Sequence, residues 1–233
     1  MRRSRSSASS SSSSLRASPP TAAATGLAMA AMAAACGAPR SAAPEPARCP
    51  PGAVTLAGPE HVARLAGCPR ATAVTIRTGA ALDLGPLGAL EAIDGDLVIG
   101  PSVGLPGASL PALRSVGGAL RVVANGDLRA LRLPRLERAG RVSIEANSAL
   151  ATLSMPRLRE VDGALRISGN PDLELVDAGA LEAVGAELAI TDNGSLVLIE
   201  APRLQRAGAV RVENNRMLPD DVARALAVKK AEP

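Results

Sequence analysis

The sequence predicts a mainly β protein: a single-stranded parallel solenoid of about seven turns, each 22 or 23 residues long, with a short helical cap at both ends. The first observation is a repeat. Its corner leucine returns at steps of 23, 23, 22, 23 and 23 residues, at Leu90, Leu113, Leu136, Leu158, Leu181 and Leu204. A fixed period in this range is typical of stacked, quasi-one-dimensional folds. The second observation is that Phe, Tyr and Trp are absent, which favours thin apolar layers over one wide core.

The net charge of +4 does not indicate a nucleic-acid-binding protein. Residues 1–35 hold four arginines and no acid, so the remaining 22 basic residues face 22 acidic ones. This remainder has no basic face and no aromatic side chain on which a base could stack. We therefore expect no nucleic acid among the partners.

Residues 1–35 are predicted to be an export signal, with an arginine-rich start and an apolar run ending before Cys36. At roughly 12 to 15 residues, this run is too short to span a bilayer. Ala34, Ala35 and Cys36 resemble the bacterial lipoprotein cleavage box, in which small residues precede a cysteine that receives lipid. The resemblance implies lipidation of Cys36 and a membrane anchor. The alternative is a secretory signal that is cut near Ala35 and leaves no lipid.

Residues 36–48 are rich in Pro and Ala and are expected to form a tether. Three cysteines in an exported chain leave one without a disulfide partner, and lipidation of Cys36 would account for this third cysteine. Cys49 and Cys68 could then form a disulfide, which would close a loop of about 20 residues and contribute up to about 3 kcal/mol. Two reduced cysteines are the alternative.

Residues 49–73 are predicted to form the N-terminal cap, with one short amphipathic helix. Pro59 suits the first helical position, Glu60 favours the helix dipole, and Gly67 ends the helix. The apolar face comprises Val62, Leu65 and Ala66. Such a helix would cover the first, otherwise open end of the stack.

Residues 74–218 are predicted to form the repeats. In each repeat, two inward apolar residues flank one outward residue, as in a half-buried strand. The seven inward pairs are Val74 and Ile76, Leu97 and Ile99, Leu120 and Val122, Val142 and Ile144, Leu165 and Ile167, Leu188 and Ile190, and Val210 and Val212. Because the pattern returns on each turn, we expect neighbouring strands to be parallel.

A glycine-containing corner precedes most of these strands, and two of the repeats are one residue shorter than the others. The missing residue falls between Ala and Val of AGRV and AGAV, at Gly140 and Gly208. A turn tolerates deletion better than a strand does. We therefore expect the strands to keep their register across both short repeats.

Residues 219–233 are predicted to form a C-terminal helical cap and tail. Pro219 can begin a helix, and Asp220 and Asp221 lie in its first turn. Val222, Ala225 and Leu226 share one face, while Lys229 and Lys230 lie near its negative end. This helix would cover the last turn.

Residues 49 to 226 resemble the receptor L domain family. The resemblance depends on three features of the repeat: the strand, the asparagine after it and the LPxL corner. The resemblance includes Cys49, the short helix, LAGCPRATAVTI and the repeated L..V.G.L.I..N..L. It implies a right-handed β-helix related to leucine-rich repeats. It also implies a domain that binds proteins or peptides in some receptors, whereas in many bacterial exported members no ligand is known.

Two polar columns recur along the repeats. The asparagines, one per turn, are expected to point inward and bond the backbone at each bend: Asn125, Asn147, Asn170, Asn193 and Asn215. The outward strand position carries Arg121, Arg166 and Arg211, on alternate turns about 10 Å apart. These arginines form a candidate binding face for a repetitive acidic partner. The alternative is a solvated sheet surface.

A further column of side chains, one per turn, alternates between negative and positive charge. Neighbouring turns would then place opposite charges side by side, and we hypothesise that this helps to specify the register of the stacked turns. Its members are Glu91, Arg114, Glu137, Arg159, Glu182 and Gln205.

The function expected from these features is non-catalytic binding or scaffolding in the cell envelope, as an exported lipoprotein. No nucleophile elbow, zinc-helix motif or phosphate loop occurs, so we expect no enzyme activity, no metal and no cofactor. The expected partner is an envelope protein or an anionic polymer. The alternatives are a secreted solenoid without lipid, or a β-helix enzyme that acts on polysaccharides.

Overall fold

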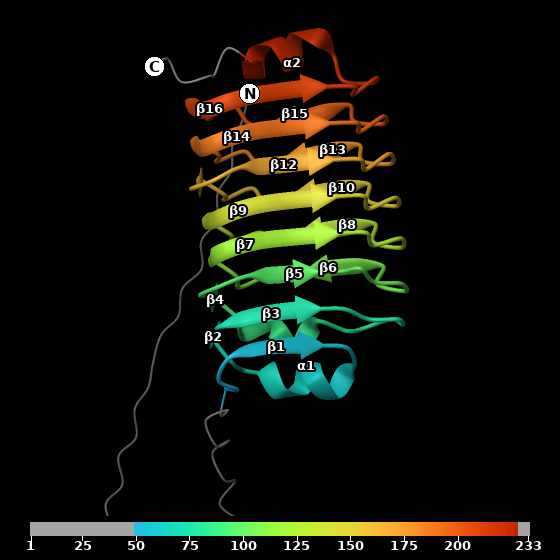
Figure 1. Cartoon of the computed structure of the whole chain (residues 1–233), viewed down its shortest axis with the longest axis vertical. Helices are drawn as coiled ribbons and strands as arrows, with labels where there is room; N and C mark the ends of the chain where they lie inside the picture. Colours follow the sequence, from blue (N-terminus) through green and yellow to red (C-terminus); the bar gives the residue numbers. More distant parts are fainter. Residues whose placement is uncertain (1–48, 228–233) are drawn as a thin grey trace, which may run out of the picture. The chain divides into compact units, whose positions relative to one another are not determined.

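The computed structural model describes residues 49–227, which form a stack of flat coils with parallel strands. Figure 1 shows the coils lying one above another, with helix α1 (Pro59–Leu65) at the first end and helix α2 (Asp220–Ala227) at the last. This arrangement confirms the predicted β-solenoid with two short helical caps. The export signal, the tether and Cys36 lie outside the described residues, as do Lys229 and Lys230.

The main sheet contains the predicted repeat strands, each paired in parallel with its neighbours. Inward positions stay aligned throughout, so that Leu97 pairs with Val74 and with Leu120. The predicted rungs are β3 (Ala73–Ile76), β5 (Leu97–Ile99), β7 (Ser115–Val123), β9 (Arg138–Glu145), β12 (Leu165–Ser168), β14 (Ala183–Thr191) and β16 (Arg206–Glu213). Three shorter strands lie on the corner side of this sheet, namely β2 (Arg70–Ala71), β4 (Ala92–Ile93) and β11 (Glu160–Val161).

The stack begins one strand earlier than the repeat pattern indicates. Strand β1 (Ala53–Leu56) pairs with β3 in full register, from Ala53 opposite Ala73 to Leu56 opposite Ile76. Leu56 is the one fully buried residue of β1, so period-2 alternation is too weak to mark it as a rung. Helix α1 lies in the connection to the next turn.

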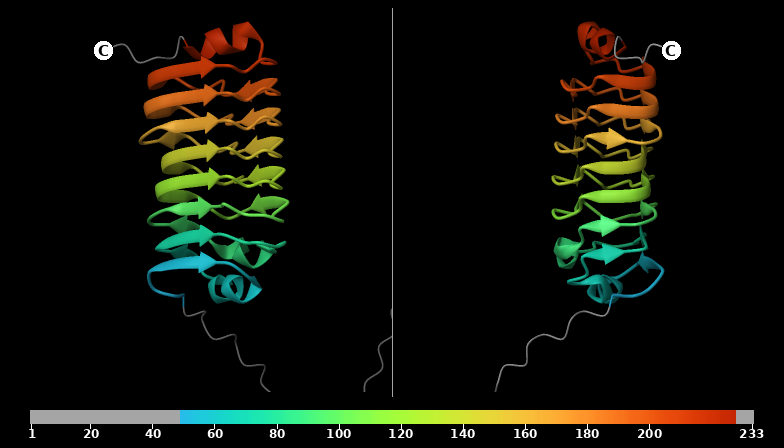
Figure 2. Two further views of the ribbon diagram at one scale, coloured as in Figure 1. Left: turned by 45° about the vertical axis from the view of Figure 1, so that its right-hand side comes forward. Right: turned by 90° about the vertical axis from the view of Figure 1, so that its left-hand side faces the viewer.

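A second parallel sheet, which the sequence pattern did not predict, closes another side of the five coils that begin with β5, β7, β9, β12 and β14 (Figure 2). Each of its strands has three residues, only the middle one of which is buried, so it shows no alternation in the sequence. The strands are β6 (Gly107–Ser109), β8 (Ala130–Arg132), β10 (Thr152–Ser154), β13 (Leu175–Asp177) and β15 (Leu198–Glu200).

The predicted position of the two deletions is confirmed. Between β7 and β9 the pairing shifts by one residue at the glycine corner, from Val116 opposite Ala139 to Ala119 opposite Arg141. The same shift separates β14 from β16. On both sides of each corner the inward residues remain paired, because the loss is confined to the turn.

The core is a continuous column of Leu, Val, Ile, Met and Ala side chains along the axis of the stack. Both helices seal it: Val62 and Leu65 of α1 are buried, and Leu226 of α2 is 6% exposed. The predicted Cys49–Cys68 disulfide is present and ties the segment before β1 to the residues after α1, with 5.6 Å between the Cα atoms.

A short 3₁₀ helix, η1 (Gly85–Ala89), lies in the second turn, where the sequence pattern did not predict a helix.

Candidate binding face on the main sheet

The asparagine column forms a hydrogen-bonded ladder through the stack. Each side-chain Nδ2 donates to the Oδ1 of the next asparagine, at 2.9 to 3.2 Å. That same Oδ1 also accepts the preceding asparagine's backbone N–H, at 3.0 to 3.2 Å. A third bond runs from Nδ2 to a carbonyl of the turn before, as from Asn170 to Ile144 at 3.0 Å. The ladder is therefore a structural element, and it leaves little amide surface for a ligand.

The ladder begins abruptly at Asn125, whose buried Oδ1 has no hydrogen-bond partner within residues 49–227. The turn before places Ser102 at this level, and its hydroxyl oxygen accepts the Thr78 N–H at 3.2 Å. Thr78 and Ser102 are both buried. Shorter side chains thus continue the polar column towards the N-terminal end without the amide-to-amide bonds.

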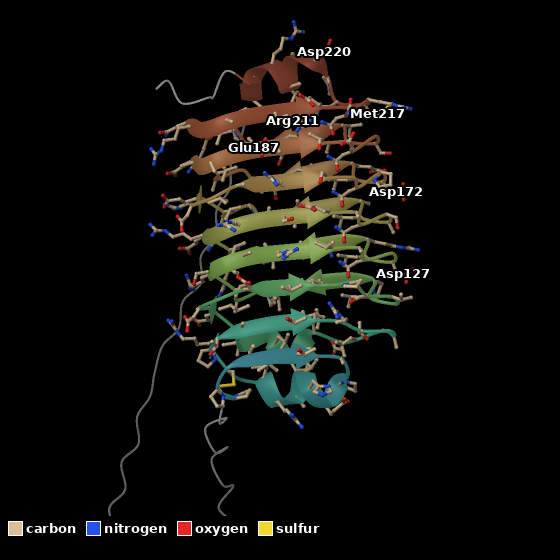
Figure 3. All side chains as sticks on the ribbon, in the orientation of Figure 1. Asp127, Asp172, Glu187, Arg211, Met217 and Asp220 are labelled. Atoms are coloured by element: carbon tan, nitrogen blue, oxygen red, sulfur yellow. A yellow bond between two sulfur atoms is a disulfide. The ribbon has the colours of Figure 1, made fainter. Side chains whose placement is uncertain are left out.

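The three arginines of the candidate face occupy one outward column of the main sheet. Strand pairing sets Arg121 beside Ser143, Ser143 beside Arg166, Arg166 beside Ala189 and Ala189 beside Arg211. Parallel strands lie about 4.8 Å apart, so arginines two turns apart are separated by about 10 Å. All three are exposed, and Figure 3 labels Arg211 on this face.

Neighbouring acids neutralise part of this column. Arg166 bonds Glu187 at 3.0 Å, and Arg211 bonds Glu213 at 2.9 Å. The hydrogen bond to Glu213 and the charge of that carboxylate raise the pKa of Arg211. In residues 49–227, Arg121 has no ion pair within 4.0 Å, so it remains available to a ligand.

A hollow of about 830 Å³ opens beside Arg121, where the glycine corners of successive turns meet the sheet. Its floor includes Gly117, Gly118, Gly140 and Gly163, which contribute no side chains. Close packing of the corners requires glycine at three of these positions, Gly117, Gly118 and Gly140. A Cβ on Gly117 would lie 2.2 Å from the Asp94 carbonyl oxygen, and one on Gly140 2.6 Å from the Gly117 carbonyl oxygen.

Arg141 also lines this hollow, and it was missing from the face expected from the sequence. It lies within β9 opposite Ala119, two residues before Ser143, rather than at the outward position that Arg121 and Arg166 occupy. Its stem passes over Gly163, where a Cβ would come within 2.8 Å of Arg141 Cγ. Alignment of the repeats across the deleted corner residue could have located it.

Most acids of the hollow already have hydrogen-bond partners. Asp96 accepts the Ala119 N–H at 2.8 Å, and Glu145 accepts the Ser143 hydroxyl. Only Asp162 has a carboxylate without such a bond among the described lining residues. The lining carries three arginines and three carboxylates, so its formal charge is zero. Arg121 and Arg141 have no ion pair within residues 49–227, so their guanidinium groups are available to an anionic group.

The column of alternating charge is present, with one member three or four residues before the glycine corner of each turn. Each member donates its backbone N–H to the preceding member, for example Glu137 to Arg114 at 2.7 Å. Within the described residues, only one of its side-chain pairs comes within 4.0 Å, namely Arg114 and Glu137 at 3.4 Å. The backbone ladder therefore sets register here, and the charges add little.

The fold is a parallel β-solenoid, and its main sheet carries a hollow lined by arginines, carboxylates and glycine corners. No protein-family model, no curated protein and no solved structure matches this chain. Within residues 49–227, no helix is long and apolar enough to cross a membrane, and no three His, Cys, Asp or Glu side chains gather at one point.

Proposed function

We propose that this protein is a non-catalytic binding module of the cell envelope, exported and held at a membrane by lipid on Cys36, whose main-sheet hollow binds an anionic polymer. The observation that carries the proposal is the hollow lined by Arg121, Arg141 and Arg166 over a floor of glycine corners. Glycine leaves the backbone accessible, and guanidinium groups match carboxylates and phosphates in a bidentate manner.

The pattern of charges favours a polymer with spaced anionic groups over a densely charged one. Arginines recur every second turn, about 10 Å apart, and acids such as Glu145 and Asp162 lie between them. A dense polyanion would place charges against these acids. A polysaccharide with one acid per sugar or per disaccharide would place its anions at intervals and its hydroxyl groups near the carboxylates.

Export is supported by the disulfide between Cys49 and Cys68, because such bonds persist in oxidising compartments. The receptor L domain resemblance adds a second candidate ligand, an envelope protein. Mass spectrometry of the mature protein tests the anchor: we expect an N-terminal diacylated Cys36. A mature chain that begins near residue 36 without lipid would favour a secreted solenoid instead.

Titration with polygalacturonate, with neutral dextran as the polymer control, tests the binding face. Replacing Arg121, Arg141 and Arg166 together by alanine is expected to weaken binding about 10-fold to 100-fold, because each exposed charged contact contributes roughly 0.5 to 1 kcal/mol. Calorimetry at low and moderate salt measures this loss, which should shrink as salt rises.

The matched control replaces Arg132, Arg135 and Arg157 by alanine, which removes the same charge from another side of the coil. This control should retain nearly full affinity. Equal losses in the two triple variants would show that binding follows net charge alone and would contradict the proposed face. The length of the recovered polymer separates binding from cleavage: shortened chains would support the polysaccharide-acting enzyme.

A further inference from the structure

The second sheet ends in an open strand edge at the C-terminal end of the stack. Its last strand, β15, pairs with β13 on one side, and no strand of residues 49–227 pairs with the other side. Figure 1 shows β15 in the last turns, below α2. Unpaired edges of this kind are templates for the addition of another strand.

The hydrogen bonds to β13 show which backbone groups face the open side. The Leu198 N–H donates to Glu174 at 3.2 Å, and the Glu200 carbonyl accepts from Ala178 at 2.9 Å. Since alternate residues of a parallel strand bond opposite neighbours, the N–H groups of Ile199 and Ala201 face the open edge. In earlier turns, the groups equivalent to that of Ala201 donate to the next strand, as Met155 does to Asp177 at 2.8 Å.

Helix α2 replaces the strand that would have covered this edge. Leu218 occupies the same position in its turn as Leu196, and two residues later the chain enters α2 rather than a sixth strand. A groove of about 680 Å³ remains between the two elements, with Ile199 and Ala201 on the strand side and Val222 and Ala225 on the helix side. The side chains that line the groove are mainly apolar, whereas the open edge of β15 contributes polar backbone groups.

Exposed apolar side chains gather beside the same edge. Four large apolar residues of the described chain are markedly exposed, and three of them lie in the last turns: Val197 at 46%, Leu198 at 41% and Met217 at 61%. Figure 3 labels Met217 at the end of this side of the stack. Two acids border the groove, Glu200 and Asp221, and neither has an ion pair within residues 49–227.

We propose that β15 binds an extended segment of another protein, which adds to the second sheet as a parallel strand. The chemistry of the edge specifies that segment. A residue opposite Leu198 lies on the outer apolar surface, a residue opposite Ile199 points into the groove towards Val222, and a residue opposite Glu200 meets a carboxylate. The partner therefore carries two apolar residues followed by Lys or Arg. Backbone bonds supply affinity and the alternating side chains supply specificity.

The test uses the full mature protein and a fluorescent, end-blocked peptide, Thr-Val-Val-Lys-Val-Thr, by fluorescence anisotropy. We expect saturable binding. Methylating the peptide nitrogens that face β15 should weaken binding at least about 10-fold, whereas methylating the nitrogens that face away should have little effect, because only the first set donates to the edge. Equal affinity of both methylated peptides, or no binding at millimolar concentration, would overturn the proposal.

Two protein variants separate strand addition from loss of structure. Ala201→Pro removes one edge donor at a position where proline is tolerated, and it should weaken binding about 5-fold to 10-fold. Glu200→Lys should weaken binding of the Lys peptide a few-fold. It should strengthen binding of the peptide in which Glu replaces that Lys. Asp177→Lys is the control, since it makes the same change of charge in the same column, on β13, which is paired on both sides. An equal loss with Asp177→Lys would contradict the site.

Two further measurements distinguish a foreign partner from the two other occupants of the β15 edge, namely the chain's own last residues and a second copy of the chain. Truncation after residue 227 should leave peptide affinity unchanged; a rise would assign the edge to the chain's own last residues and overturn a foreign partner. Analytical ultracentrifugation should show a monomer. A dimer that Ala201→Pro dissociates would assign the edge to a second copy of this chain.

Discussion

Replacing Asn170 by alanine is expected to lower the free energy of unfolding by about 4 kcal/mol. The change removes the acceptor of the Asn147 backbone N–H, at 3.0 Å, and the donor to the Ile144 carbonyl, also at 3.0 Å. Asn170 is fully buried, so water cannot replace these bonds. Each buried group left without a partner costs roughly 1 to 3 kcal/mol, and two are left here. Urea unfolding followed by circular dichroism measures the loss.

Asn215 provides the matched control at the end of the same ladder. Its side chain is only partly buried and donates to the Ile190 carbonyl at 2.8 Å. Because water reaches this end, Asn215→Ala should cost roughly half as much or less. If both replacements cost the same, burial would not determine the contribution of the ladder.

Replacing Gly117 by alanine is expected to cost about 3 kcal/mol, although the change adds a single methyl group. The new Cβ would lie 2.2 Å from the Asp94 carbonyl oxygen of the preceding turn. That oxygen belongs to the backbone of a packed turn, so relief requires the turns to separate. Overpacking of this kind typically costs 1 to 3 kcal/mol. Thermal and urea unfolding measure the effect.

Gly126, nine residues further along the same turn, is the control. A Cβ there would have no neighbouring atom within 4 Å, so Gly126→Ala should change stability by less than about 1 kcal/mol. Comparable losses at the two positions would show that the corners can move apart. The close stacking that forms the floor of the hollow would then be unsupported.

The repeat pattern was sufficient to predict seven rungs of the main sheet, because each carries two inward residues and five of them are followed by an asparagine at a fixed distance. It also located the deletions, since a missing residue can only be absorbed at the glycine corner. The second sheet was not predictable in this way. Residues such as Leu131 and Leu153 are the single inward positions of three-residue strands, and one apolar residue defines no period.

The candidate face was predicted only in part, for a related reason. Arg121, Arg166 and Arg211 share the outward strand column, which alternation identifies directly. Arg141 enters the hollow from the first half of β9, next to Gly140, and its place depends on how two turns pack around Gly163. The open edge of β15 could not be predicted from the repeat pattern either, because it depends on α2 taking the place of a strand.

The central claim is that successive turns stack in register, one strand spacing apart, and pulsed electron paramagnetic resonance tests it most directly. Nitroxide labels at Thr75 and Arg166 lie four strand spacings apart, and labels at Thr75 and Arg211 lie six. At about 4.8 Å per spacing, the expected backbone separations are about 19 Å and about 29 Å. With Cys36 replaced by serine, the mean distance should therefore grow by about 10 Å between the two pairs. Equal distances, or a shorter distance for Thr75 and Arg211, would contradict the stack and the binding face built on it.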